Sequence, residues 1–296
     1  MLLTMKSLVL FQLASQLFYG FVLGVVQGIS EWLPVSSKTQ VLIASTYLFN
    51  LPFNQAYTLG LFMEVGTILA AVIYFKKELW EMVKFIIRRG DANGKSLFTY
   101  VFVSMIFTGI VGAPIYLIID SIQGSYNIGI PMLILGLMLI GDALLLKYAK
   151  GKLMPNGERR KLADMGIKDF IVIGVAQGIA ALPGVSRSGI TTSSMLFLNV
   201  EADEAFRLSF MNSIFATGAA VLLTVVASKQ NIIGATAQIG APGLLIAIIV
   251  SFGISLVLIR FLIQIAKHSK IAYFTAALGV LAIVGGLIAF FAGVGG

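Results

Sequence analysis

The sequence of 296 residues contains no cysteine, a single histidine and very little charge. Without cysteine the chain cannot form a disulfide, a thiolate metal site or a cysteine nucleophile. Only 11% of its residues are charged while 58% are apolar, and the mean hydropathy is +0.96. Soluble domains carry about a quarter charged residues. Several charge-free windows of about 20 residues are typical of membrane-spanning helices, so the sequence predicts an all-α polytopic membrane protein.

The net charge of +8 reflects membrane topology. Of the 21 Lys and Arg residues, 13 fall within two segments, 76–95 and 147–168. Clusters of this kind mark cytoplasmic loops under the positive-inside rule. We therefore attribute the excess of basic residues to the orientation of the chain in the membrane and expect no nucleic-acid partner.

Apolar segments of spanning length recur along the whole chain. The six candidate spans are 57–75, 99–119, 128–148, 206–228, 242–266 and 271–294. Two further apolar regions, 8–50 and 168–199, are interrupted by polar residues and a central proline. Each resembles two helices of half length, which at 1.5 Å per residue reach only about the bilayer midplane. We expect both regions to form re-entrant helical hairpins.

The order of these segments predicts an inverted-topology repeat inside one membrane domain, residues 1–296. Repeat one covers about 8–150 and repeat two about 168–296. Each holds one hairpin and three spans, and three crossings invert the second repeat. Three matches support a duplication: "GVVQGI" at 24 with "GVAQGI" at 174, "LPVSS" at 33 with "LPGVSRS" at 182, and "TILAAV" at 67 with "TGAAV" at 217. Such repeats are common in membrane transporters.

The two hairpins carry the polar groups that suggest chemistry. The first reads "QGISEWLPVSSKTQ" from Gln27 and the second "QGIAALPGVSRSGIT" from Gln177. A proline precedes each serine cluster, so we expect new helices to start near Ser36–Ser37 and Ser186–Ser188. Helix N-termini present unpaired N–H groups and a positive dipole end. Two such ends approaching from opposite leaflets, together with the Arg187 guanidinium, predict a phosphate site inside the membrane.

Two carboxylates in apolar segments, Glu31 and Glu64, need a separate explanation. A carboxylate repels a neighbouring anion unless it holds a divalent cation, is protonated or acts as a base. Together with a phosphate site, the pair suggests a metal-bridged phosphate. Structural interpretations remain open: a Glu31–Arg187 ion pair that locks the hairpins, a Lys38 that reaches the interface, and serines that only cap helices.

At these motifs the sequence resembles the undecaprenyl pyrophosphate phosphatase family, integral membrane enzymes associated with bacitracin resistance. Gln27 and Glu31 fit the first family motif, and Pro183 to Thr191 complete the second, "PGxSRSxxT". The resemblance covers essentially the whole chain. It implies hydrolysis of a polyprenyl diphosphate to the monophosphate, which recycles the lipid carrier of cell-envelope glycans, with Mg²⁺ or Ca²⁺ as cofactor.

One position departs from the family pattern. Bacterial members commonly read "SSTGH" where this chain reads "SSKTQ", so the family histidine falls on Gln40. Glutamine cannot act as a general acid or base, and the only other candidate, His268, lies in a short basic loop. The "SSKTQ" form resembles archaeal members, and the identity of the lipid carrier stays open.

The sequence therefore predicts a site with three kinds of residue. The catalytic residues are Glu31, Ser37 and Arg187; the phosphate-binding residues are Ser36, Lys38, Ser186, Ser188 and Thr191; the metal ligands are Glu31, Gln27 and Glu64. By analogy with the family, Ser37 attacks the terminal phosphorus and Glu31 is its base; a metal-activated water is the alternative.

Two further expectations concern the functional class of the protein and its location in the cell. A lipid-phosphate flippase needs the same anion site and inverted halves, so it is the rival to the phosphatase. We expect a multi-pass protein of the cell membrane with its site facing the outer side. The sequence leaves the oligomeric state open, with a homodimer as one option.

Overall fold

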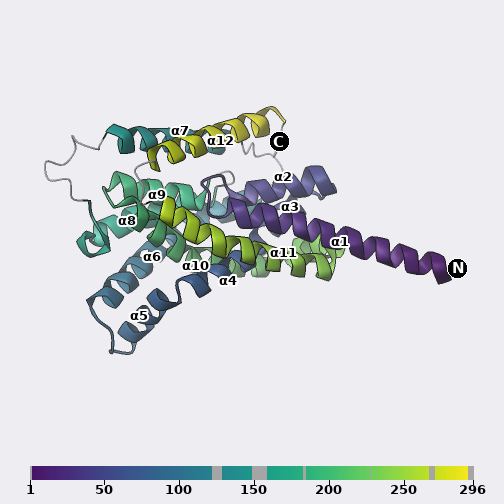
Figure 1. Ribbon diagram of the computed structural model, residues 1–296, viewed down its shortest axis with the longest axis horizontal. Helices are drawn as coiled ribbons and strands as arrows, with labels where there is room; N and C mark the ends of the chain where they lie inside the picture. The colour runs from purple at the N-terminus through teal and green to yellow at the C-terminus, as the bar shows by residue number, and fades with distance from the viewer. Residues whose placement is uncertain are drawn as a thin grey trace.

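The computed structural model describes residues 2–121, 129–148, 159–182, 185–227, 229–266 and 271–292, and the elements of this part of the chain are helices joined by short turns (Figure 1). The elements are α1 (Leu2–Ser30), α2 (Ser37–Phe49), α3 (Phe53–Phe62), α4 (Glu64–Tyr74), α5 (Lys76–Ile86), α6 (Ala92–Ser121), α7 (Gly129–Tyr148), the 3-10 turn η1 (Leu162–Asp164), α8 (Ile167–Ile179), α9 (Arg187–Phe197), α10 (Ala202–Ala227), α11 (Lys229–Ala266) and α12 (Ile271–Phe291). The prediction of an all-α protein is confirmed.

Within the described residues, five helices are long and apolar enough to cross a membrane, or six if the bent α3–α5 segment counts as one span. The five are Val9–Ser30, Ala92–Ile118, Ala202–Val226, Ile239–Ala266 and Tyr273–Phe291. The predicted span 242–266 agrees with a break in α11, where Gly240 has φ 75° and Pro242 follows. The chain is a membrane protein, as the scarcity of charge indicates.

The expectation of half-length helices is correct for three elements and wrong for one. α2 and α8 have 13 residues each and α9 has 11. α1, in contrast, runs for 29 residues without a break. The polar residues Gln12, Ser15 and Gln16 do not interrupt it, because a helix satisfies its own backbone and Ser15 donates its hydroxyl hydrogen to the carbonyl of Phe11.

Three helix pairs make the most extensive contacts: α1 with α11, α6 with α8, and α7 with α12. Glycines bring the first two pairs together. A Cβ on Gly24 would lie 2.7 Å from the carbonyl oxygen of Ala247, and one on Gly174 would lie 2.4 Å from that of Ser104. Small residues at such crossings let helix backbones approach closely.

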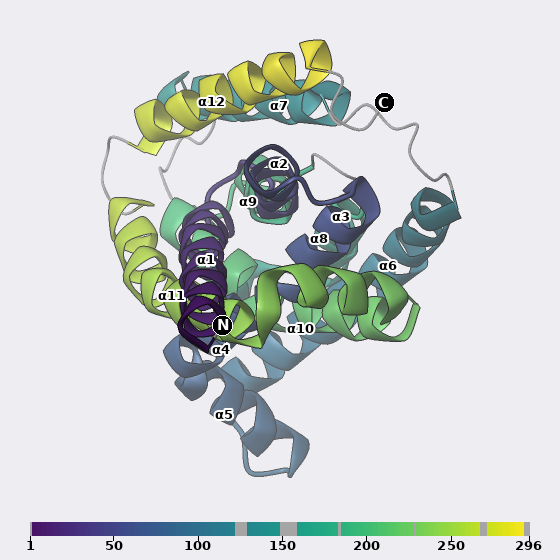
Figure 2. The same ribbon diagram turned by 90° about the vertical axis from the view of Figure 1, so that its right-hand side faces the viewer.

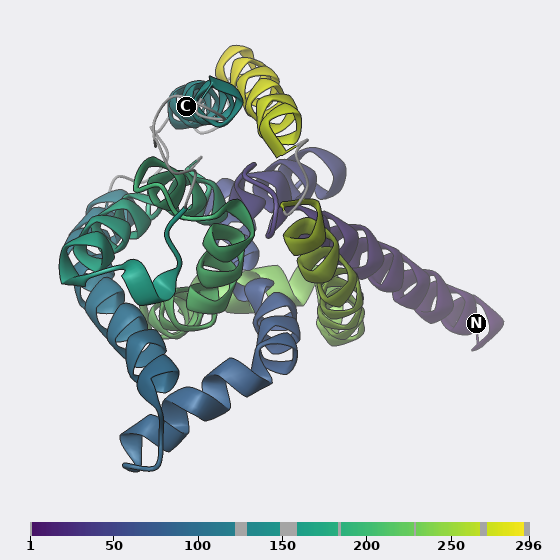
Figure 3. The same cartoon turned by 60° about the vertical axis from the view of Figure 1, so that its left-hand side comes forward.

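The short helices α2 and α9 lie inside this frame. Figure 2 shows them one behind the other, with α1, α11 and α10 around them. The α7–α12 pair lies along one side of the molecule and α5 at the opposite edge, a layout that Figure 3 repeats from another angle. The frame thus holds the starts of α2 and α9 in its interior.

Several sequence features lie outside the described residues. They are Pro183 and Gly184 of the second motif, His268, and residues 122–128 and 149–158.

Candidate active site

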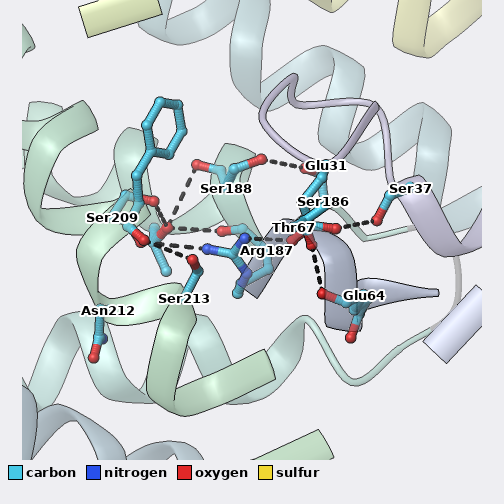
Figure 4. Close-up of polar contacts among 12 residues, drawn as sticks. Glu31, Ser37, Glu64, Thr67, Ser186, Arg187, Ser188, Ser209, Asn212 and Ser213 are labelled. Carbon is cyan, nitrogen blue, oxygen red and sulfur yellow. Dashed lines mark hydrogen bonds and ion pairs between the residues drawn. The ribbon is translucent and has the colours of Figure 1, made fainter. Parts of the chain in front are cut away.

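The first turns of α2 and α9 meet in the interior, although their residues are about 150 positions apart. The hydroxyls of Ser186 and Ser188 donate to the carbonyl oxygen of Leu33 at 3.3 and 3.1 Å. Arg187 Nη2 lies 2.7 Å from Glu31 Oε1. Figure 4 shows this meeting point. The predicted helix starts are confirmed, since α2 begins at Ser37 and α9 at Arg187.

Glu31 is the centre of the polar network. Its Oε1 accepts from Arg187, and its Oε2 accepts from Ser37 Oγ at 2.6 Å and from Gln27 Nε2 at 3.0 Å. Its side chain is 4% exposed and that of Arg187 is 10% exposed. A buried carboxylate requires such partners, because an unpaired charge in a low-dielectric interior is very costly. The ion pair that the sequence left open is therefore present, and it also aligns Ser37 with a carboxylate.

The backbone of α10 supports Arg187 from the other side. Arg187 Nη1 donates to the carbonyl oxygen of Ser209 at 3.3 Å. Thr191 donates to the carbonyl oxygen of Arg187 at 2.7 Å, and its hydroxyl lies 2.5 Å from that of Ser209. Thr191 does not line the pocket described below. Its position behind Arg187 makes it a support for the first turn of α9 instead of the phosphate ligand that we expected.

The two helix starts differ in how they are capped. Ser186 caps α9, because its Oγ accepts from the N–H of Gly189 at 3.2 Å. No described side chain caps α2: Ser36 has φ 54° and its hydroxyl pairs with Thr39 at 3.0 Å. The start of α2 thus leaves its first N–H groups without a side-chain cap in the described part of the chain, as an anion site at a helix start requires. Gln40, at the position of the family histidine, donates to the carbonyl oxygen of Val35 and holds the break in place.

A pocket with about 180 Å³ of water-accessible volume opens from the helix starts. Eight of the predicted site residues line its polar end: Glu31, Ser36, Ser37, Lys38, Glu64, Ser186, Arg187 and Ser188. The rest of the wall is mainly small and apolar and includes Gly109, Gly112 and Ala113 from α6 and Ala216, Ala219 and Ala220 from α10. Lys38 makes no ion pair within the described chain. The pocket therefore joins a charged end to an apolar arm.

Two buried oxygen atoms at the site lack hydrogen-bond partners among the described residues. Glu64 is 2% exposed and its Oε2 has no hydrogen-bond partner; Gln27 Oε1 is likewise buried and unpaired. No three His, Cys, Asp or Glu side chains of the described residues form a ready metal cluster. The oxygen-only donor set, Glu31, Glu64 and Gln27, nevertheless suits a hard divalent cation completed by phosphate or water oxygens.

A second polar cluster was not anticipated from the sequence. Gln177 donates to Thr108 at 2.9 Å, and Asn212 donates to Gln177 at 3.3 Å and to Ser104 at 3.1 Å. The available signal was a polar stripe in an apolar span: Ser209, Asn212, Ser213 and Thr217 recur at helical spacing on α10. Intramembrane polar residues usually face the interior, so the stripe marks the inward face of α10.

Comparison with known proteins places this geometry in a family. A family profile described as "Bacitracin resistance protein BacA" matches residues 20–284. A protein of Saccharolobus solfataricus named undecaprenyl-diphosphatase is 42% identical over 270 residues, which cover 91% of this chain and 95% of the relative. Relatives with the same name from Sulfurisphaera tokodaii (45% over 264 residues, covering 89% and 94%) and Pyrobaculum aerophilum (35% over 268 residues, covering 90% and 96%) are similar over comparable lengths. Because the profile and these relatives each cover most of the chain, it belongs to the bacitracin resistance protein BacA family.

Proposed function

We propose that this protein hydrolyses undecaprenyl diphosphate to the monophosphate and inorganic phosphate, and so recycles a lipid carrier for cell-envelope glycan synthesis. The observation that carries the proposal is the pocket that joins buried phosphate-binding groups to an apolar arm. A lipid diphosphate has the matching two-part chemistry. The curated relatives are named for this reaction.

The diphosphate binds at the uncapped start of α2. Backbone N–H groups there and the Lys38 ammonium supply positive charge. Arg187 uses two bonds for Glu31 and Ser209, and its guanidinium has further N–H donors for phosphate oxygens. These fixed donors stabilise the charge on the transferring phosphoryl group.

Ser37 is the nucleophile in the mechanism that we favour. Its hydroxyl donates to Glu31 Oε2 at 2.6 Å, so the carboxylate can take the proton as Oγ attacks the terminal phosphorus. The bond from that phosphorus to the bridging oxygen breaks, and the lipid monophosphate leaves. Water then cleaves the phosphoserine. A water that attacks the phosphorus directly, with Glu31 as its base, is the alternative.

A divalent cation, Mg²⁺ or Ca²⁺, fits among Glu31, Glu64 and Gln27. The unpaired buried oxygens of Glu64 and Gln27 support this placement. When bound, the cation would neutralise phosphate charge. In its absence Glu31 is still held by Arg187, Ser37 and Gln27, so the chain itself positions its base.

The architecture that we propose is an inverted repeat, 8–150 and 168–296, with re-entrant hairpins at 8–50 and 168–199. Helix contacts support it: if α1 corresponds to α8 and α6 to α11, then the α1–α11 contact has its counterpart in α8–α6. The α7–α12 contact is its own counterpart. Two starts of short helices meeting in the interior also fit two hairpins of opposite direction.

We place the protein in the cell membrane, with the pocket open to the outer side. The basic segment 76–95 puts the first residues of α6 on the cytoplasmic side. The residues of α6 and α10 that line the pocket lie between Met105 and Tyr116 and between Ala216 and Leu223. These are the second halves of two helices that we place with their first residues on the cytoplasmic side. The pocket therefore lies toward the outer side.

Release of inorganic phosphate tests the proposal. The assay uses a long-chain polyprenyl diphosphate in detergent, with Mg²⁺, with Ca²⁺ and with chelator. We expect metal-dependent release by the wild type and its loss in Arg187→Ala. A folded wild-type protein that moves labelled lipid across vesicles without releasing phosphate would identify the flippase instead.

A further inference from the structure

Helix α5 turns away from the segment that precedes it and lies at an edge of the molecule. The chain bends by 73° between the segment ending at Tyr74 and α5, which begins at Lys76. α5 then lies at the edge of the molecule, where it packs on α6 and touches α4 (Figures 1 and 3). Five of its 11 residues are exposed, and only Met82 is buried.

The composition of α5 excludes the hydrocarbon core as its location. Its sequence KKELWEMVKFI holds Lys76, Lys77, Glu78, Glu81 and Lys84 within 11 residues. Each charge at the centre of a bilayer costs several kcal/mol by insertion scales. The apolar residues are confined to particular faces, so the helix is amphipathic.

One face packs on the protein and holds both acidic residues. Met82 is buried, and the ring of Phe85 lies 5.6 Å from that of Phe98 on α6. Glu78 lies 3.5 Å from Arg207 of α10, and Glu81 accepts a hydrogen bond from Asn93. The negative charges are therefore engaged on the inner side.

The outer face combines an apolar stripe with cations. Trp80, Val83 and Ile87 are 59%, 41% and 52% exposed and follow the i, i+3, i+7 spacing of one helix face. The cations that flank this stripe or follow it are Lys76, Lys77, Lys84, Arg88 and Arg89, none of which makes an ion pair among the described residues.

We propose that α5 is an interfacial helix that binds the surface of a membrane containing acidic lipids. The apolar stripe enters the boundary between headgroups and acyl chains, and the unpaired cations bind acidic headgroups. Separation of charge across the helix selects this partner, because the acids that would repel such lipids are held on the protein side. The helix thereby fixes the depth at which α4 and α6, on either side of it, cross the membrane.

The two tryptophans of the chain permit a direct test on the full-length protein. Trp32 is 1% exposed, so lipid-borne quenchers reach Trp80. The protein is placed in nanodiscs with equal amounts of phosphatidylglycerol and phosphatidylcholine, only one of which carries bromine near the headgroup. We expect quenching to be about twofold stronger with brominated phosphatidylglycerol, and to disappear in Trp80→Phe.

Charge variants separate the two parts of the proposal. In the triple variant Lys76→Gln, Lys77→Gln, Lys84→Gln the preference for the acidic lipid should fall. The control variant, in which the same three lysines are replaced by arginine, keeps the charge and should keep the preference. High salt should also reduce it. Equal quenching by both lipids, unchanged by charge or salt, would overturn the acidic-lipid preference. Absence of lipid quenching, with Trp80 fully accessible to acrylamide, would overturn the membrane contact itself.

Discussion

At the scale of single residues, Glu31 connects three segments of the chain. Gln27 reaches it from α1, Ser37 from α2 and Arg187 from α9. Each partner satisfies a buried carboxylate oxygen, and each also belongs to the proposed reaction. Stability and catalysis therefore depend on the same bonds, and variants at this site must be measured for both.

The Ser37→Ala variant tests the nucleophile. It removes one charge-assisted hydrogen bond, so we expect a loss of about 1–3 kcal/mol in the free energy of unfolding and a fall of at least about 100-fold in phosphate release. Ser30→Ala is the matched control, because Ser30 is buried and its hydroxyl bonds the carbonyl oxygen of Val26 in its own helix. Retention of most activity by Ser37→Ala would favour direct attack by water.

The Glu31–Arg187 pair predicts a stability pattern that a functional assay alone cannot reveal. Arg187→Ala leaves a buried carboxylate unpaired, so we expect it to be destabilised by about 3–5 kcal/mol. The double variant Glu31→Gln, Arg187→Met removes both charges and should regain much of this stability while remaining inactive. Thermal unfolding in detergent measures the difference. A double variant less stable than Arg187→Ala would contradict this account of the pair.

At the scale of elements, α6 and α10 form the apolar arm of the pocket with small residues. A Cβ at Gly109 would meet no atom within 4 Å, so a larger side chain there is tolerated by the fold and projects into empty space. We therefore expect Gly109→Leu to shorten the arm without unfolding the protein.

Chain-length dependence checks this expectation. For Gly109→Leu we predict a KM raised about tenfold for a long-chain prenyl diphosphate and unchanged for a short-chain one. Gly253→Leu on α11, also without neighbours within 4 Å, is the control. Equal effects on both substrates would show that the arm does not hold the lipid chain.

The segment before α8 is fixed by an ion pair that predicts a pH effect on stability. Arg160 donates to both carboxylate oxygens of Asp169, at 2.6 and 3.2 Å. This hydrogen bonding lowers the pKa of Asp169, aided by the N–H of Gly166 and opposed by partial burial. Because the folded pKa lies below the unfolded value, the stabilisation is present above the unfolded pKa and is lost as pH falls through the folded pKa.

The Asp169→Asn variant tests the direction of this pKa shift. We expect the variant to be less stable than the wild type by about 1 kcal/mol at neutral pH, with the difference vanishing in acid. Unfolding temperatures measured from neutral pH down to acid provide the comparison. A difference that grows in acid would contradict the assigned direction.

At the scale of the whole molecule, the two halves contribute different parts of one site. The first supplies Glu31, Ser37, Lys38 and Glu64, and the second supplies Arg187 with its serines. Arg187 occupies the position that the 150-residue offset assigns to Ser37 in the first half. Neither half alone therefore contains both the base and the guanidinium that holds it.

Cysteine labelling tests the re-entrant topology, and the absence of native cysteine makes it simple. Ser7, in the first turns of α1, and Pro52, which follows α2, are both exposed. We predict that Ser7→Cys and Pro52→Cys react with an impermeant reagent from the outer side, and that Arg88→Cys reacts only from the cytoplasmic side. Labelling of Ser7→Cys and Pro52→Cys from opposite sides would show that 8–50 crosses the membrane.

The sequence by itself determined the helical class, most of the spans and the starts of α2 and α9. These features depend on local properties, namely hydropathy, proline and the spacing of polar residues. It also pointed to Glu31 and Arg187, because charge in an apolar segment is visible without a structure. Ser37 was chosen through the family resemblance, and the catalytic roles of all three stay predictions. The expectation of a half-length helix at α1 is wrong, because polar residues on the surface of a helix do not break its backbone hydrogen bonds.

Only the tertiary structure decided which of these groups meet and in which roles. In the structure Arg187 pairs with Glu31, Thr191 lies behind Arg187 as a support, and Asn212 bonds Gln177. These contacts join residues 18 to 156 positions apart. Local propensities do not specify which residues so far apart in the sequence come into contact. The packing of α1 on α11 and of α6 on α8 specifies it, because this packing fixes where the short helices can start and end.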